Sequence, residues 1–219
     1  LIALEVPGFR PAIVSLPLGS AGPRPVLVAT HGNFDRPEWQ CETWRAIVQD
    51  AGFVLCPRGV ARRDTAHLEH PRFHYPSNQA LGREIEAGLA AQRARFGARV
   101  AAGPVVYAGF SQGAIMGVPI VSRAPRQFPR AVLLEGGAGQ WSAARLKAFA
   151  GGGGRVLFGC GQPGCAAAGK RVAAQLEKAG VPARVVYGGN VGHAYAELVT
   201  RQIQEHFAWV VEGDPRWGR

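Results

Sequence analysis

Residues 105–118 read VVYAGFSQGAIMGV, and the expected fold depends on this stretch. Its apolar, β-branched start at 105–108 is typical of a buried strand, and its end has the pattern of a helix. Between them lies a Gly-x-Ser-x-Gly pentapeptide centred on Ser111. Small residues on both sides of a serine allow a sharp strand-to-helix turn that lifts the hydroxyl above the sheet. We therefore predict that Ser111 is a nucleophile; the alternative is a glycine-rich connection with an incidental serine.

Apolar runs and helical patterns alternate along the rest of the chain. Because a parallel crossover needs a dozen or more residues, this alternation predicts an α/β fold, with a mostly parallel central sheet and helices on both faces. The first apolar run joins the second through a short Pro/Gly loop and is predicted to be an antiparallel edge strand. Strands are expected at 12–16, 26–30, 53–56, 105–108, 131–134, 155–158 and 183–187, and helices at 38–49, 78–96, 112–122, 141–149, 164–178 and 194–210.

The sequence shows no long linker, shift in composition or internal repeat, so we expect a single domain over residues 1–219. Glycine, proline and charged residues at 212–219 predict a loose C-terminal tail. No apolar run approaches the roughly 18 residues of a transmembrane helix, which predicts no membrane span. The hydrophobic content of 47% and charged content of 18% exclude a disordered or fibrous chain.

The formal net charge is +10, from 25 Lys and Arg residues against 15 Asp and Glu residues. Nearly all the cations are arginines, and they are dispersed, with one tight group at Arg58, Arg62 and Arg63. A nucleic-acid-binding domain clusters its cations on one face or along one helix. We therefore expect no nucleic-acid partner.

The cysteines are Cys41, Cys56, Cys160 and Cys165, and none forms a C-x-x-C motif. Their even number fits two disulfides, with Cys41–Cys56 and Cys160–Cys165 as candidate pairs; buried free thiols are the alternative. Disulfides favour an exported protein, periplasmic or secreted. A cytoplasmic location is the alternative.

A second motif, His31-Gly32-Asn33-Phe34-Asp35, directly follows the expected strand at 26–30. In a sheet of this kind, the loop after an early strand can bring a backbone N–H beside the nucleophile. With the N–H of Gln112, at the start of the helix after Ser111, it would hold the oxyanion of a tetrahedral intermediate. We predict Asn33 and Gln112 as the oxyanion donors and a structural role for His31.

A third motif is the glycine-rich segment GGNVGHAY at 188–195, between the last expected strand and the last helix. Of the histidines, His193 alone lies late in the chain at such a loop, where the chain order of nucleophile, acid and histidine requires the base. We predict that His193 is the catalytic base. The alternative is a histidine that caps the final helix.

With these motifs the chain resembles an α/β-hydrolase, and within that fold the small carboxylesterase/phospholipase family that includes acyl-protein thioesterases. The resemblance covers nearly the whole chain and rests on His31-Gly32, Cys56-Pro57-Arg58-Gly59, the serine pentapeptide and Gly192-His193. It implies hydrolysis of carboxylic esters or thioesters by a Ser-His-acid triad, a small-molecule ester or acyl substrate, and neither a metal nor an organic cofactor.

The chain departs from the family pattern at the acid. In the family the acid follows the strand before last in a Gly-x-x-Asp-Pro-like turn, where this chain has Gln162. A neutral amide cannot stabilise an imidazolium as a carboxylate does. Between Ser111 and His193 the carboxylates are Glu135 and Glu177. Glu177 falls in an amphipathic helical pattern, where a glutamate facing solvent is ordinary.

Glu135, in contrast, ends an apolar strand at the edge of the sheet where open α/β folds bind their ligands. A carboxylate there needs a partner that offsets its desolvation. We predict that Glu135 is the triad acid, relocated by one strand, and that it pairs with His193. One alternative is a pair with Arg130 or Arg155, and another is a Ser-His dyad without an acid.

A segment rich in histidine contains His67, His70 and His74. Pro71 would break the helix needed to align them, so no metal site is expected. The same long loop carries arginines that would favour an anionic substrate.

Aromatic residues close to the motifs are predicted to line a substrate pocket, with core packing as the alternative for each. They are Phe34, Phe110 and Trp141. The short connections leave little room for a large lid domain. The predicted function is therefore that of a serine esterase or thioesterase. The alternatives are a non-catalytic or weakly active binding protein on the same fold, and a peptidase or polyester depolymerase with the same triad.

Overall fold

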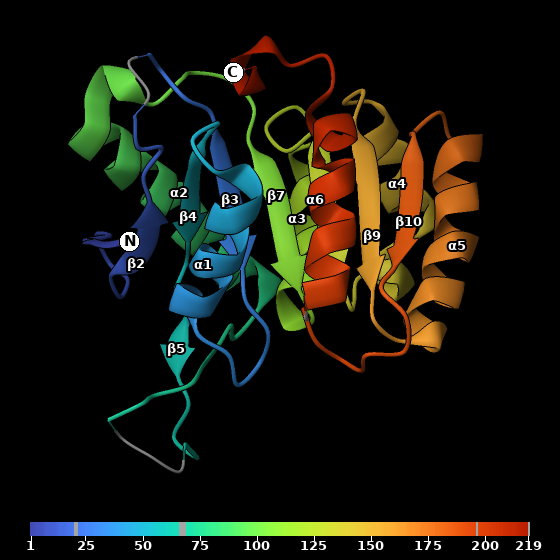
Figure 1. The fold of residues 1–219 in the computed structure, drawn as a ribbon, viewed down its shortest axis with the longest axis horizontal. Helices are drawn as coiled ribbons and strands as arrows, with labels where there is room; N and C mark the ends of the chain where they lie inside the picture. The colour runs from blue at the N-terminus through green and yellow to red at the C-terminus, as the bar shows by residue number, and fades with distance from the viewer. Residues whose placement is uncertain (20–21, 66–68, 196, 219) are drawn as a thin grey trace.

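The computed structural model describes residues 1–19, 22–65, 69–195 and 197–218. In these residues the central sheet has the strand order β1-β2-β4-β3-β7-β8-β9-β10 (Figure 1). Every pairing from β4 to β10 is parallel, whereas β2 pairs antiparallel with β1 and β4, so the predicted mostly parallel sheet is confirmed. The strands are β1 (Ile2–Leu4), β2 (Ala12–Ser15), β3 (Val26–Thr30), β4 (Phe53–Cys56), β7 (Val106–Phe110), β8 (Arg130–Leu134), β9 (Arg155–Cys160) and β10 (Ala183–Tyr187), with a separate pair β5 (Val60–Ala61) and β6 (Phe73–His74).

Helices cover both faces of the sheet, as predicted. The helices α1 and α6 lie on one face, nearer the viewer in Figure 1, and the other helices lie behind the sheet. Alternate residues of each strand point to opposite faces; Val28 faces the larger core cluster, and Leu27 faces the cluster with α1 and α6. The helices are α1 (Pro37–Val48), α2 (Asn78–Phe96), α3 (Gln112–Arg123), α4 (Ala143–Ala150), α5 (Pro163–Lys178) and α6 (Glu197–Val211), with short 3₁₀ turns η1 (Gly97–Arg99), η2 (Ala138–Gln140) and η3 (Pro215–Trp217).

The prediction that the first apolar run is an edge strand is wrong. The strand β2 is antiparallel, as expected, but β1 pairs with its outer side through Ile2–Val14 and Leu4–Ala12. A turn containing Gly8, whose φ is +80°, reverses the chain between these two strands. The edge position therefore belongs to β1.

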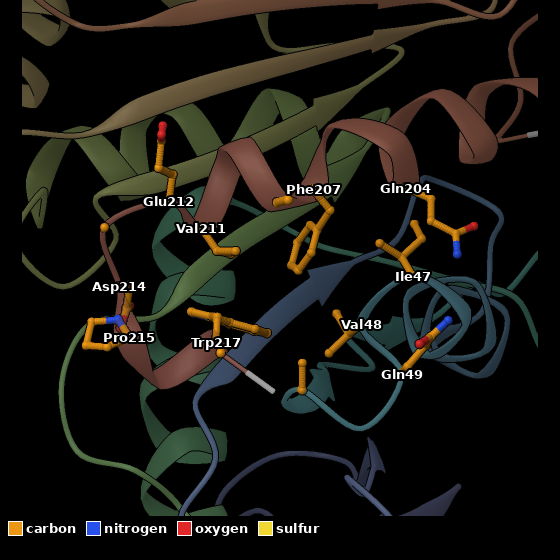
Figure 2. Close-up of a pocket in the computed structure, with 14 residues that line it drawn as sticks. Ile47, Val48, Gln49, Gln204, Phe207, Val211, Glu212, Asp214, Pro215 and Trp217 are labelled. Atoms are coloured by element: carbon orange, nitrogen blue, oxygen red, sulfur yellow. The ribbon is translucent and has the colours of Figure 1, made fainter.

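The prediction of a loose tail at 212–219 is also wrong for the residues that the structure describes. The side chain of Trp217 is 6% exposed and packs edge-on against Phe207 of α6. Beside these rings a hollow of about 690 Å³ opens between the ends of α1 and α6, and Figure 2 shows Trp217 and Phe207 on its wall. Gly52, which directly precedes β4, contacts Trp217, so this hollow lies at the amino-terminal end of the strands.

The opposite, carboxyl-terminal end of the parallel strands carries the loops with the predicted site residues. An arm formed by β5, β6 and the other described residues between β4 and α2 extends beyond this end (Figure 1). No lid domain covers it in the part of the chain that the structure describes. None of the described helices combines the length and hydropathy that crossing a bilayer requires.

Candidate active site

Ser111 occupies a strained turn between β7 and α3. Its φ of 50° and ψ of −110° lie where residues other than glycine are rare. A Cβ on Gly109 would come within 2.6 Å of the backbone carbon of Gly113, so the glycine allows the close approach of strand and helix that the turn needs. The Gly113 carbonyl also accepts a hydrogen bond of 2.7 Å from the Tyr107 hydroxyl. These contacts fix the serine at the end of the strand, with its side chain partly exposed.

His193 lies beside this serine. Its Nε2 is 2.8 Å from Ser111 Oγ, and its ring packs 5.2 Å from the ring of Phe110, measured between centroids. The imidazole side chain is 48% exposed. Solvent can therefore reach this ring.

Glu135 completes a hydrogen-bonded chain with these two residues. It directly follows β8, has a φ of 50°, and its side chain is 1% exposed. Its Oε2 lies 3.2 Å from His193 Nδ1, while its Oε1 accepts the backbone N–H groups of Gly161 and Gln162. These two N–H groups give the buried carboxylate oxygen hydrogen-bond partners within the fold.

The other arrangements that the sequence allowed for the acid are not formed. Glu177 is exposed on α5, and Arg155 pairs with Glu212 at 2.7 Å. Arg130 lies 3.7 Å from Asp214. Among the described residues Glu135 is therefore paired with His193 and not with an arginine.

Gln162, where the resemblance led us to look for the acid, contacts Glu135 through its backbone. Its exposed side chain lies at the N-terminus of α5, and its N–H is 3.2 Å from Glu135 Oε1. A disulfide between Cys160 and Cys165 closes the same turn. The turn thus holds the Glu135 carboxylate with two N–H donors. The two sulfurs near Glu135 are bonded to each other and are not available as thiolate ligands for a metal.

The histidine-rich segment offers no aligned set of ligands in the residues that are described. His74 lies in β6 and His70 in the exposed arm, and they are part of no cluster of metal-binding groups among these residues. His67 lies outside the described residues.

The loop that contains Asn33 touches the serine turn. A Cβ on Gly32 would lie 3.3 Å from Ser111 Cβ, and Gly113 donates its N–H to the His31 carbonyl at 3.1 Å. Asn33 itself is exposed, and its Oδ1 accepts a hydrogen bond of 2.7 Å from Arg62. The structure therefore brings Gly32, the residue before Asn33, close to Ser111.

The second predicted donor, Gln112, is the first residue of α3. The first N–H groups of a helix have no partner within the helix, and they carry partial positive charge. The Gln112 side chain accepts the N–H of Tyr75 at 2.9 Å and donates to its carbonyl at 3.2 Å. The arm is therefore hydrogen-bonded to the residue that follows Ser111.

His31 is buried, and both nitrogens of its ring face backbone carbonyl groups. Its Nδ1 lies 2.7 Å from the Gly32 carbonyl and its Nε2 lies 2.8 Å from the Arg58 carbonyl, while Tyr75 stacks on the ring. Burial lowers its pKa in spite of these contacts. The predicted structural position of His31 agrees with this environment.

The three predicted pocket aromatics differ in their surroundings. Phe34 is 43% exposed and has a φ of 60°, so strained backbone holds its ring at the surface. Trp141 is 7% exposed and packs on Phe149 within the core, so its predicted place in a pocket is wrong. Phe110 is also buried, because its ring lies under Gly32 and against His193. Strand and loop patterns alone do not distinguish these three environments.

Neither a family profile nor a curated protein matches the sequence. Solved structures match it over nearly the full length of both chains. A carboxylesterase from Bacillus cereus has 16% identity and a TM-score of 0.61, covering 91% of this chain and 93% of its own. Esterase PE8 has 15% identity and a TM-score of 0.64, and the match covers 95% of this chain and 100% of that esterase.

Est1E from Butyrivibrio proteoclasticus has 13% identity and a TM-score of 0.63, with 96% of this chain and 98% of its own covered. This chain has the α/β-hydrolase fold. At these identities the likeness establishes the fold alone. The candidate site is therefore described by its own residues, Ser111, His193 and Glu135.

Proposed function

We propose that this α/β-hydrolase is a serine hydrolase that cleaves carboxylic esters or thioesters through an acyl-enzyme on Ser111. The observation that supports this most is the continuous hydrogen-bonded chain from Ser111 Oγ through both ring nitrogens of His193 to Glu135. The strained backbone of Ser111 and Glu135 is typical of residues whose positions serve a reaction.

The first half of the proposed reaction forms the acyl-enzyme. His193 Nε2 takes the hydroxyl proton of Ser111 as Oγ attacks the carbonyl carbon of the ester. The backbone N–H groups of Asn33 and Gln112 bind the resulting oxyanion. The protonated imidazole then gives its proton to the leaving alcohol or thiol, and the bond between acyl carbon and leaving group breaks.

The second half releases the acid. Water enters, His193 removes its proton, and the hydroxide oxygen attacks the acyl carbon. The intermediate collapses to the carboxylic acid as Ser111 Oγ is reprotonated. In both halves Glu135 accepts the Nδ1–H of His193 and stabilises the imidazolium, and no metal or organic cofactor takes part.

The compartment and the substrate class belong to the same proposal. The disulfides Cys41–Cys56 and Cys160–Cys165 suit an oxidising, exported environment. The open carboxyl-terminal end of the sheet suits small-molecule esters, and the similar solved structures include proteins named esterases.

The test is the steady-state hydrolysis of p-nitrophenyl acetate and butyrate. We expect Ser111→Ala to abolish turnover and Glu135→Gln to lower kcat by about 10⁴, the order of loss when a triad acid becomes an amide. Glu177→Gln is the matched control, because it makes the same chemical change on an exposed face of α5. Wild-type kcat in Glu135→Gln would refute the relocated acid and favour the dyad.

Labelling with a fluorophosphonate tests whether Ser111 is a nucleophile, and the result does not depend on which ester is used as the substrate. The wild type should gain the mass of one phosphonyl group on Ser111, and Ser111→Ala should gain none. A protein that neither labels nor turns over these esters would instead be a binding protein on a hydrolase fold. A peptidase or a polyester depolymerase would label as well, and its kcat/KM on peptides or polymers would exceed that on small esters.

A further inference from the structure

A cavity of about 510 Å³ opens between the His31–Asp35 loop, the start of α1 and the arm. Its walls include the rings of Phe34 and Trp39, which are 43% and 39% exposed. The charged residues Arg36, Asp64 and Arg72 also line the cavity. The mechanism proposed above uses none of these side chains.

The cavity is close to the nucleophile along the chain and in space. Gly32 touches Ser111, and Phe34 is two residues further, at most about 7 Å of extended chain. The N–H of Phe73, the neighbour of Arg72, donates to the Asp35 carbonyl at 3.0 Å. The wall that carries Arg72 is therefore hydrogen-bonded to the loop beside the proposed oxyanion site.

Most of the charges around the cavity are neutralised by neighbours. Arg36 lies 3.4 Å from Glu38, and Arg62 makes hydrogen bonds of 2.8 and 2.7 Å to Asp64. The guanidinium of Arg72 has no acidic partner among the described residues. It lies over the Trp39 ring, with its Cζ 4.2 Å from the ring centroid.

Stacking leaves the binding groups of this arginine available. A guanidinium that lies over an aromatic ring still directs its N–H donors outward in its own plane, where they match the two oxygens of a carboxylate. The rings of Phe34 and Trp39 supply apolar surface at the same place. The two features together select a group that is apolar and carries one negative charge.

We infer that this cavity is a subsite for the carboxylate-bearing aromatic part of an ester substrate, with Arg72 as the residue that binds the carboxylate. The inference rests on the proposed function, because the bound ester is the one that Ser111 attacks. The substrate class is esters of phenols that carry a carboxylate on the ring. It includes similar aromatic acids in which one carboxyl group is esterified and one is free.

The kinetic test compares 4-carboxyphenyl butyrate with its neutral isostere, 4-carbamoylphenyl butyrate. The ratio of their kcat/KM values cancels differences in the amount of folded enzyme. Arg72→Gln should lower the ratio of charged to neutral ester about tenfold, the effect of losing a charge-assisted hydrogen bond. Arg171→Gln removes the same charge from an exposed position on α5 and should leave the ratio unchanged. An equal ratio in Arg72→Gln and wild type would overturn the subsite.

A binding measurement separates this inference from the proposed function. In the Ser111→Ala background, titration calorimetry should detect 4-carboxyphenyl butyrate, with about tenfold weaker binding after Arg72→Gln is added. If the wild type hydrolyses no ester while this difference in binding persists, the proposed function fails and the site remains as a carboxylate-binding site. If Ser111→Ala and Ser111→Ala/Arg72→Gln bind the probe equally, the inference fails, whatever the activity of the wild type.

Discussion

At the scale of single residues, one buried carboxylate organises two loops of the site. Asp35 accepts the backbone N–H groups of Gly32 and Arg36, at 3.2 and 2.8 Å. Its Oδ1 also accepts a hydrogen bond of 3.1 Å from the hydroxyl of Tyr195, which lies two residues after His193. The loop proposed to hold the oxyanion and the loop with the proposed base are therefore joined through Asp35.

We expect Tyr195→Phe to loosen this connection. The phenyl ring would keep its edge-on packing against Phe110, so the change isolates one hydrogen bond to a charged group, worth about 1.5–3 kcal/mol. Burial and the negative charge of Asp35 raise the pKa of Tyr195, so the phenol remains a donor across neutral pH. Urea unfolding should show the loss and kcat/KM should fall; Tyr187→Phe, an exposed hydroxyl, should change neither.

Residue types and order were enough to select Ser111, His193 and Glu135, because the serine pentapeptide is specific and few carboxylates lie between serine and histidine. The sequence misplaced Trp141, since an apolar ring after a loop fits a pocket wall and the core equally well. It did not single out the pairing of Arg72 with Trp39, because contacts between residues so far apart in the chain depend on the tertiary fold.

At the scale of elements, the long periodic segments were predictable and the short ones were not. The parallel strands and all the expected helices agree with the structure to within a few residues. The strands β1, β5 and β6 have two or three residues each, too few for a period-2 pattern to appear. The tail was misjudged because its glycine and proline suggest a loose end, whereas Trp217 is anchored in a hydrophobic cluster.

The anchoring of η3 gives a pH-dependent prediction. Asp214 is partly buried, which raises its pKa, but the hydrogen bonds and charge of Arg216 and the charge of Arg130 outweigh burial and hold the pKa below 3.8. An acid whose pKa is lower in the folded state than in the unfolded state stabilises the fold at pH values above its unfolded pKa. This contribution is lost as the pH falls through the folded pKa.

Asp214→Asn should therefore lower Tm at pH 7 by about 3 °C, the shift that about 1 kcal/mol produces in a protein of this size. The difference from wild type should shrink as pH falls through the lowered folded pKa of Asp214, because the carboxyl is then protonated in both states. Calorimetric scans of both proteins from pH 7 to pH 2.5 measure this, and a difference that stays constant with pH would contradict the ion-pair explanation.

At the scale of the whole molecule, the two disulfides have different positions relative to the site. Cys41–Cys56 joins α1 to the end of β4, and both residues are fully buried. Cys160–Cys165 closes the turn whose N–H groups hold Glu135. The first bond therefore constrains the global fold, and the second constrains the position of the proposed acid.

Removing each bond should consequently affect different properties. Loop-closure entropy gives about 3 kcal/mol for the 15-residue separation of Cys41 and Cys56, and about 2 kcal/mol for the 5-residue separation of Cys160 and Cys165. We expect Cys41→Ala/Cys56→Ala to show the larger loss in urea unfolding while retaining kcat. Cys160→Ala/Cys165→Ala should lose less stability but reduce kcat on p-nitrophenyl butyrate severalfold, because Glu135 would no longer be held against His193. Loss of kcat in the first double variant and not in the second would reverse this assignment.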